Sequence, residues 1–109
     1  MTRATVLADG LYFGEGPRWH QGRLWYSDFY DHKVKSIDTA GVARTELEID
    51  DQPSGLGWLP DGRLLVVAMH RRQLLRLDPG GPVLHADLGG VADYHANDMV
   101  VDAVGRAYV

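Results

Sequence analysis

An internal repeat of about forty residues is the feature that most constrains how this chain folds. Residues Trp19–Asp28 match residues Leu59–Ala68, with Gly22-Arg23-Leu24 lying forty positions before Gly62-Arg63-Leu64. A third copy begins at Asp102–Val109, forty-three positions after the corresponding part of the second. A period of roughly 20–50 residues is typical of solenoids, propellers and other repeat architectures. The chain is therefore expected to consist of copies of one small structural unit.

Each complete repeat contains four short apolar or alternating runs separated by turn residues. The predicted strands are Gly14–Trp19, Leu24–Asp28, Lys33–Asp38 and Thr45–Ile49 in the first repeat, and Ser54–Leu59, Leu64–Met69, Gln73–Asp78 and Val83–Leu88 in the second. Asp-Gly, Gly-Gly and Pro-Asp-Gly turns between such runs indicate antiparallel hairpins. No segment shows a sustained helical period of apolar residues, so helix is a poor fit.

The second strand of each repeat is apolar at consecutive positions, at Leu24–Tyr26 and Leu64–Val67. Such a strand is buried on both faces, as it would be in a blade packed between two neighbouring blades. We therefore predict an all-β fold, a β-propeller of four-stranded antiparallel blades at residues 11–50 and 51–90, with the start of a third blade at 91–109. Since propellers close with roughly four to eight blades, we expect residues 1–109 to be an amino-terminal fragment. If isolated, its exposed blade faces would favour self-association.

Composition excludes several classes of function. The net charge of −4 and the lack of Lys or Arg runs argue against a nucleic-acid partner. No apolar stretch approaches the roughly 20 residues that cross a bilayer, so we expect no membrane partner and a soluble, cytoplasmic protein. The chain has no cysteine, so a metal would be held by oxygen or imidazole ligands.

Polar residues recur where the first strand of each repeat begins. Alignment on the Gly-Arg pairs places Gly14-Glu15 over Ser54-Gly55 and over Asn97-Asp98. First strands line the channel of a propeller, so we expect the side chains of Glu15, Ser54 and Asn97 to converge at one mouth of it. The carboxylate of Glu15 and the amide oxygen of Asn97 are hard ligands suited to calcium, magnesium or manganese, and zinc is also compatible.

Structural roles compete with these assignments. Glu15 also fits a solvated turn carboxylate, and Asn97-Asp98 also fits an Asx turn that opens a strand. Four other histidines fall at turns or strand ends without metal-ligand spacing, and we assign them surface or packing roles: His20, His32, His70 and His85. The three tryptophans are assigned to packing between blades: Trp19, Trp25 and Trp58.

Three segments resemble the senescence marker protein, regucalcin and gluconolactonase family of lactone hydrolases. Gly14–Trp19 resembles the family's opening Glu-Gly-Pro-x-Trp motif. Asn97–Asp102, followed by Gly105–Val109, resembles its Asn-Asp-Gly-x-x-Asp segment and the strand that comes after it. Pro53–Gly57 and Pro60–Arg63 also look like the family's second blade, so the similarity covers essentially the whole chain.

The resemblance implies a six-bladed propeller that hydrolyses sugar-type or related lactones with a divalent metal ion. By it, Glu15 is a metal ligand, and Asn97 contacts substrate near the metal. His95 stands where the family often carries an arginine that contacts the substrate. Histidine has a shorter side chain than arginine and a different charge, so this substitution puts a sugar-lactone substrate in doubt. The other metal ligands and the aspartate expected to act as general acid or base lie beyond Val109. No catalytic residue is therefore assigned within the chain, and the isolated chain is expected to be inactive.

Two other functions fit a propeller. One is a non-catalytic interaction scaffold of the NHL or WD-repeat kind, although the repeats lack the Gly-His and Trp-Asp pairs of WD proteins. The other is a lactone- or sugar-binding regulator that keeps the pocket without turnover. Further ligands in the later blades would favour the enzyme.

Overall fold

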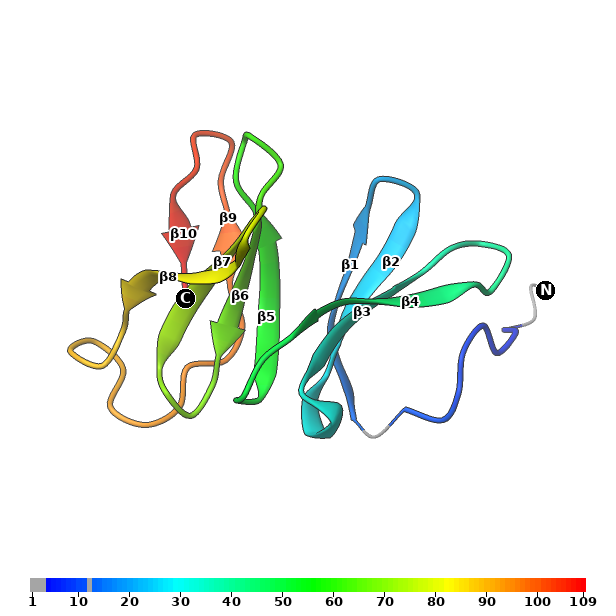
Figure 1. Ribbon diagram of the computed structural model, residues 1–109, viewed down its shortest axis with the longest axis horizontal. Coiled ribbons are helices and arrows are strands. Elements are labelled where there is room, and N and C mark those ends of the chain that lie inside the picture. The colour runs from blue at the N-terminus through cyan, green and yellow to red at the C-terminus, as the bar shows by residue number, and fades with distance from the viewer. Residues whose placement is uncertain (1–3, 12) are drawn as a thin grey trace.

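A computed structural model of the chain describes residues 4–11 and 13–109. It contains two four-stranded antiparallel sheets in the order β1-β2-β3-β4 and β5-β6-β7-β8, and a two-stranded hairpin, β9-β10 (Figure 1). The strands are β1 (Gly14–His20), β2 (Arg23–Asp28), β3 (Lys33–Ile37), β4 (Ala43–Glu48), β5 (Pro53–Trp58), β6 (Leu64–Ala68), β7 (Gln73–Asp78), β8 (Gly81–Asp87), β9 (Val100–Val101) and β10 (Ala107–Tyr108). The only helix among the described residues is a single 3₁₀ turn at Phe29–Asp31. The predicted all-β fold of four-stranded antiparallel units is confirmed.

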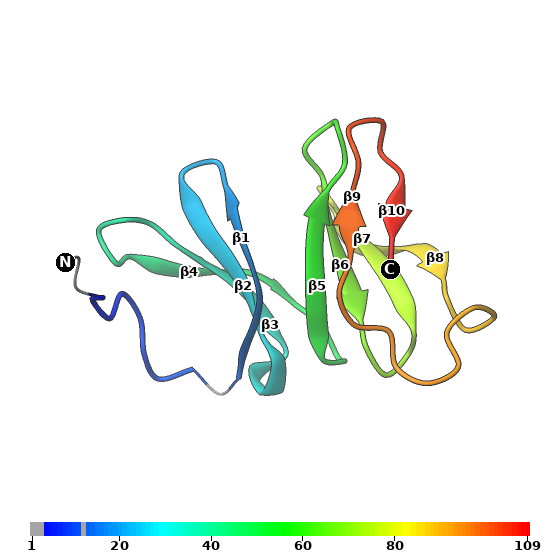
Figure 2. The ribbon, with the colours of Figure 1, turned by 180° about the vertical axis from the view of Figure 1, so that it is seen from behind.

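The first strands of the three units lie next to one another. Both ribbon views place β5 between β1 and β9 (Figures 1 and 2). A buried hydrogen bond links the first two units, from the Ser27 hydroxyl to the Ser54 carbonyl oxygen at 2.6 Å. The Gly55 amide links the second and third units by donating to the Asn97 carbonyl oxygen at 3.0 Å.

Strand β6 is buried on both of its faces, as its unbroken apolar sequence predicts. One cluster of buried residues joins the first unit to one face of β6: Trp25, Val34, Leu47, Ile49, Leu56, Leu64, Val66 and Ala68. A second cluster joins the other face to the third unit: Leu65, Val67, Leu74, Ala96 and Met99. The second unit is thus packed between its two neighbours in the manner of a propeller blade.

The turns between first and second strands differ by one residue. The β1–β2 turn has two central residues, Gln21 and Gly22, both with positive φ (50° and 75°), as a type I′ hairpin requires. In the β5–β6 turn three residues separate Leu59 from Arg63, whose backbones are hydrogen-bonded at 2.9 Å. This turn closes through Gly62 at φ 90°, a conformation that favours glycine.

That extra residue changes the alignment of the first strands. Trp19 pairs with Leu24, and Trp58 pairs with Leu64, so the two tryptophans are equivalent. The sequence alignment, which placed Trp19 over Leu59 and Glu15 over Gly55 and Asp98, is therefore wrong by one residue within β1. The register places Glu15 level with Ser54 instead.

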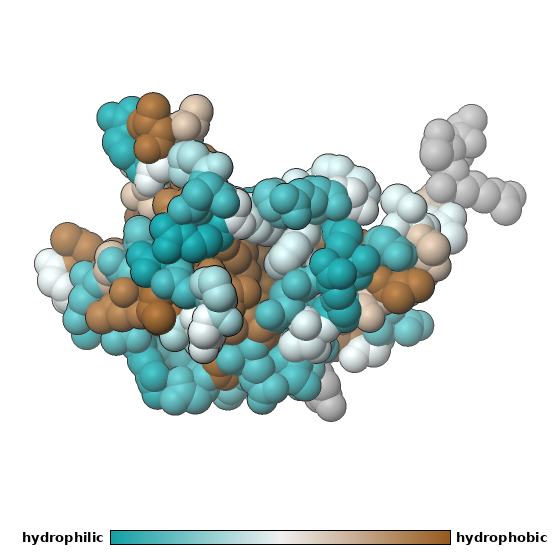
Figure 3. All heavy atoms as spheres, turned by 45° about the horizontal axis from the view of Figure 1, so that its top comes forward, coloured by the Kyte–Doolittle hydropathy of each residue, from teal (hydrophilic) through white to brown (hydrophobic). Residues whose placement is uncertain are grey.

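Apolar side chains remain uncovered on parts of the surface. Figure 3 shows hydrophobic patches among largely hydrophilic residues on the face it displays. No helix in the described part of the chain is long and apolar enough to cross a membrane.

Candidate functional site at the starts of the first strands

Ser54 and Asn97 meet where β5 and the segment leading into β9 begin. The buried Ser54 hydroxyl donates a hydrogen bond to the Asn97 side-chain oxygen. Because the Gly55 amide also holds the Asn97 carbonyl, both the backbone and the side chain of Asn97 are fixed to β5. The side-chain NH₂ group of Asn97 makes no hydrogen bond to the described residues, so it can donate to a ligand.

Glycine in β5 is what allows this close approach. A Cβ atom at Gly55 would lie 2.6 Å from the Met99 nitrogen and 2.8 Å from the Asp98 Cα. At Gly57 a Cβ would lie 2.6 Å from the Val101 side chain. The glycine at position 55 leaves room for the backbone of the third unit, and the glycine at position 57 leaves room for the side chains of Val101 and Met99.

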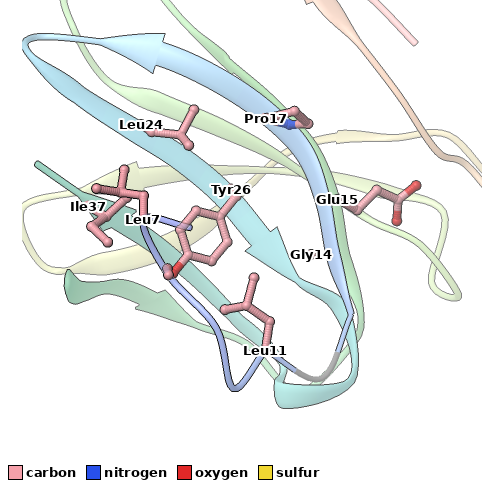
Figure 4. Close-up of a pocket in the computed structure, with 9 residues that line it drawn as sticks. Leu7, Leu11, Gly14, Glu15, Pro17, Leu24, Tyr26 and Ile37 are labelled. Carbon is pink, nitrogen blue, oxygen red and sulfur yellow. The ribbon is translucent and has the colours of Figure 1, made fainter. Parts of the chain in front are cut away.

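Glu15 occupies the equivalent position on β1. It pairs with Ser27, whose hydroxyl reaches the carbonyl of Ser54, and a Cβ on the next residue, Gly16, would lie 3.1 Å from that carbonyl oxygen. Glu15 is half-buried and forms no ion pair or hydrogen bond with the described residues. Figure 4 shows its carboxylate pointing away from Leu24 and Tyr26 in the adjacent apolar hollow. The structure thus brings Ser54 and Asn97 into contact and sets Glu15 one strand away.

His95 lies beside Asn97, and both line a hollow of about 320 Å³ that extends to Leu88 and Val109. The His95 ring stacks on Tyr94 at 4.0 Å between centroids with an interplanar angle of 24°. On the other side it meets His70 edge-on at 4.3 Å and 77°. His95 is half-buried, so part of the ring can contact a bound molecule.

Arg18 on β1 reaches past β5 to the third unit. Its guanidinium donates to the Asp98 carboxylate at 2.8 Å and to the Met99 carbonyl at 3.1 Å. The same Asp98 oxygen accepts from the Met99 amide at 2.8 Å. The residue that follows Asn97 is thereby tied to the first unit.

Two further carboxylates near this edge, Asp50 and Asp51, are engaged in turns. Asp51 is buried, and its carboxylate accepts hydrogen bonds from three backbone amides, including those of His70 and Arg71. Asp50 pairs with the Arg71 guanidinium at 2.7 Å. These carboxylates stabilise the approach to β5 and the β6–β7 turn.

Three of the remaining histidines have the structural roles predicted for them. His20 stacks on Trp58 at 3.9 Å and 12°, and burial lowers the pKa of its imidazole. His32 forms a turn at φ 57°, and the exposed His85 contacts Arg76 at 3.3 Å.

Trp25 and Trp58 pack edge-to-face between the blades at 5.3 Å. Trp19 differs from its prediction, because its side chain is 63% exposed.

The residues present supply part of a site for a hard divalent cation. Within residues 4–11 and 13–109 no group of three or more His, Asp or Glu side chains is placed to hold a metal. Three oxygen donors lie at the starts of the first strands: the carboxylate of Glu15, the hydroxyl of Ser54 and the amide oxygen of Asn97. This donor set fits calcium, magnesium or manganese in character, and it is incomplete in number.

A family model described as the SMP-30/gluconolactonase/LRE-like region matches residues 13–109. The chain belongs to this family. A solved gluconolactonase from Xanthomonas campestris superimposes with a TM-score of 0.77 and 26% sequence identity, over 93% of this chain and 35% of that one. A luciferin-regenerating enzyme shares the fold at a TM-score of 0.64 and 14% identity, over 86% of this chain and 35% of that one. A search of curated proteins gave no significant match.

This family member therefore spans about a third of the length of both solved structures, 35% in each case. Membership confirms the resemblance drawn from the Glu-Gly-Pro and Asn-Asp motifs. The individual roles of Glu15, His95 and Asn97 stay predictions. Sequence reasoning missed the contacts of His70 with His95 and of Arg18 with Asp98. No sequence signal marks either contact, since each joins two different blades.

Proposed function

We propose that this chain supplies the first blades of a longer β-propeller that hydrolyses sugar-type or related lactones with a divalent metal ion. The observation that carries the proposal is the pairing of Ser54, on the strand next to β1, with Asn97 in the segment before β9, while Glu15 holds the position on β1 equivalent to Ser54 in a member of the SMP-30/gluconolactonase/LRE-like family.

In this proposal Glu15 holds the metal. Its half-buried carboxylate has no competing cation among the described residues and points away from the apolar hollow beside it. A divalent cation bound there would polarise a lactone carbonyl. Calcium, magnesium, manganese and zinc are all candidates, and the further ligands would come from later blades.

Asn97 and His95 bind the substrate. Ser54 and Gly55 fix the Asn97 oxygens, so its NH₂ group is directed to a ligand without loss of side-chain freedom on binding. His95 presents a ring nitrogen on a shorter side chain than the family's arginine. We expect this to favour lactones whose hydroxyl groups lie close to the wall of the hollow.

Lactone hydrolysis, followed with a pH indicator, tests the proposal on the full-length protein, on the 109-residue chain and on a full-length Glu15→Gln variant. We expect the full-length protein to be active, a chelator to abolish the activity and one of the four metals to restore it. Glu15→Gln should remove most activity, while the matched Glu48→Gln change on the outer strand β4 should have no effect.

The 109-residue chain should hydrolyse lactones at the background rate, because the proposed proton-transfer group lies in later blades and contributes about 10²- to 10⁴-fold. A fully active chain would place the catalytic group within residues 1–109. Full activity of Glu15→Gln would remove Glu15 from the site. Tight lactone binding without turnover by the full-length protein would favour a binding module instead.

A further inference from the structure

His70 lies in the turn between β6 and β7, in the second blade, and it contacts Gln52 and the predicted substrate-binding residue His95. Its Nε2 donates a hydrogen bond to the side-chain oxygen of Gln52, which precedes β5. Its ring is set edge-on against His95, with centroids 4.3 Å apart and an interplanar angle of 77°. The sequence predicts a surface or packing role for His70, and the structure shows a packed ring, held by one blade against a predicted substrate-binding residue of the next.

His95 is held from two sides. Tyr94 stacks on one side at 4.0 Å, but it is the preceding residue in the chain and is itself largely exposed. His70, unlike Tyr94, belongs to a different blade from His95. Its position is set by the hydrogen bond to Gln52 and by Asp51, whose carboxylate binds the backbone amide of His70. The contact with His70 therefore fixes the His95 ring relative to β5, the strand that also fixes Asn97.

Fixing the ring matters for binding. A half-buried imidazole that samples several rotamers loses that freedom when it binds a ligand, and the loss weakens affinity. A ring already set at the wall of the hollow, beside the fixed amide of Asn97, avoids this loss.

We propose that His70 is a positioning residue, which sets the ring of His95 for substrate binding. The proposal rests on the proposed lactonase function, in which His95 contacts the substrate. It assigns His70 no contact with the substrate: its effect is transmitted through His95.

Four variants of the full-length protein test this in kinetic assays of lactone hydrolysis. His70→Ala removes the ring contact, and His70→Phe keeps an edge-on ring while it removes the N–H donor. His95→Ala removes the positioned group, and the double variant combines both losses. His85→Ala, an exposed histidine on β8, is the matched control.

We expect His70→Ala to raise KM by about 2- to 12-fold with kcat little changed, the range that corresponds to one aromatic pair. His70→Phe and His85→Ala should stay within about twofold of the unaltered protein. His95→Ala should raise KM, and adding His70→Ala to it should cause no further rise, because a residue that acts through His95 has no effect without it.

An NMR measurement separates this proposal from the lactonase function. The His95 imidazole resonance should shift and broaden in His70→Ala and return toward its original position in His70→Phe. If no lactone is hydrolysed, the proposed function fails and the NMR result alone decides the positioning role. An unchanged His95 resonance, an unchanged KM in His70→Ala, or a further rise in KM in the double variant would each overturn the proposal.

Discussion

Gly55→Ala tests whether close packing of the first strands positions the site. An added methyl group would lie 2.6 Å from the Met99 nitrogen and 2.8 Å from the Asp98 Cα, both backbone atoms. Ordinary contacts between such atoms are about 3.5–4.0 Å, so the third unit must move away from β5 by roughly 1 Å. That movement lengthens the 3.0 Å hydrogen bond from the Gly55 amide to the Asn97 carbonyl.

The cost follows from these two effects. Overpacking costs about 1–3 kcal/mol, and a lost backbone hydrogen bond costs about 0.5–1.5 kcal/mol, so the free energy of unfolding should fall by about 1.5–4.5 kcal/mol. Urea unfolding followed by tryptophan fluorescence would measure it. If the full-length protein has the proposed lactonase activity, its KM for a lactone should also rise, because Asn97 moves with its carbonyl.

Gly80→Ala is the matched control for this change. Gly80 has no atom within 4 Å of an added Cβ, and its φ lies outside the left-handed region. The same substitution there should leave the free energy of unfolding unchanged or raise it by about 0.4–1 kcal/mol. If Gly55→Ala were no more destabilising than Gly80→Ala, the account of strand packing at the mouth would be refuted.

Three further predictions concern the core, an ion pair and the response to acid. Leu56→Ala, at a fully buried position between the first two blades, should lower the free energy of unfolding by about 2–5 kcal/mol in urea titrations, and a loss below 1 kcal/mol would contradict the assigned core. Arg18→Asp and Asp98→Arg should each raise the KM for a lactone, and the double charge swap should restore it in part, because it re-forms the ion pair that ties the segment after Asn97 to β1 but not the hydrogen bonds to Met99. A swap no better than the single variants would rule out that link. Hydrogen bonds from the Val42 and Ala40 amides hold the pKa of Asp38 below its ordinary value of 3.8, so its stabilising effect is present above that pH and is lost as pH falls through the lowered pKa. Asp38→Asn should therefore flatten the acid side of the stability profile measured by thermal unfolding, and an unchanged profile would contradict this assignment.

The strand order could be predicted because each element carries its own signal. The apolar run of β6 predicts burial on both faces, and its alternate residues divide between the two core clusters as that requires. Gly22 and Gly62 mark the turns at which positive φ is needed. Local patterns of this kind depend on residues close together in the chain.

The arrangement of the site was less predictable, because it depends on contacts between blades. One additional residue in the β5–β6 turn shifts the equivalence of the first strands, so an alignment on Gly-Arg pairs misplaces Glu15. His70 and His95 are separated by 25 positions, and Arg18 and Asp98 by 80. Neither separation has a periodicity that would reveal the contact.

The corrected register explains why the polar residues at the starts of the first strands lie level with one another. In the first two blades a polar residue is followed by glycine, as Glu15-Gly16 and Ser54-Gly55. Each glycine faces backbone of the next blade: a Cβ at Gly16 would lie 3.1 Å from the Ser54 carbonyl oxygen, and one at Gly55 would lie within 2.8 Å of Asp98. The glycine therefore sets how closely successive first strands approach, and the polar residue before it is carried to the same level on each strand. Replacing either glycine with a larger residue would separate the polar groups without altering any of them, so the spacing of this candidate site is determined by residues that take no part in its chemistry.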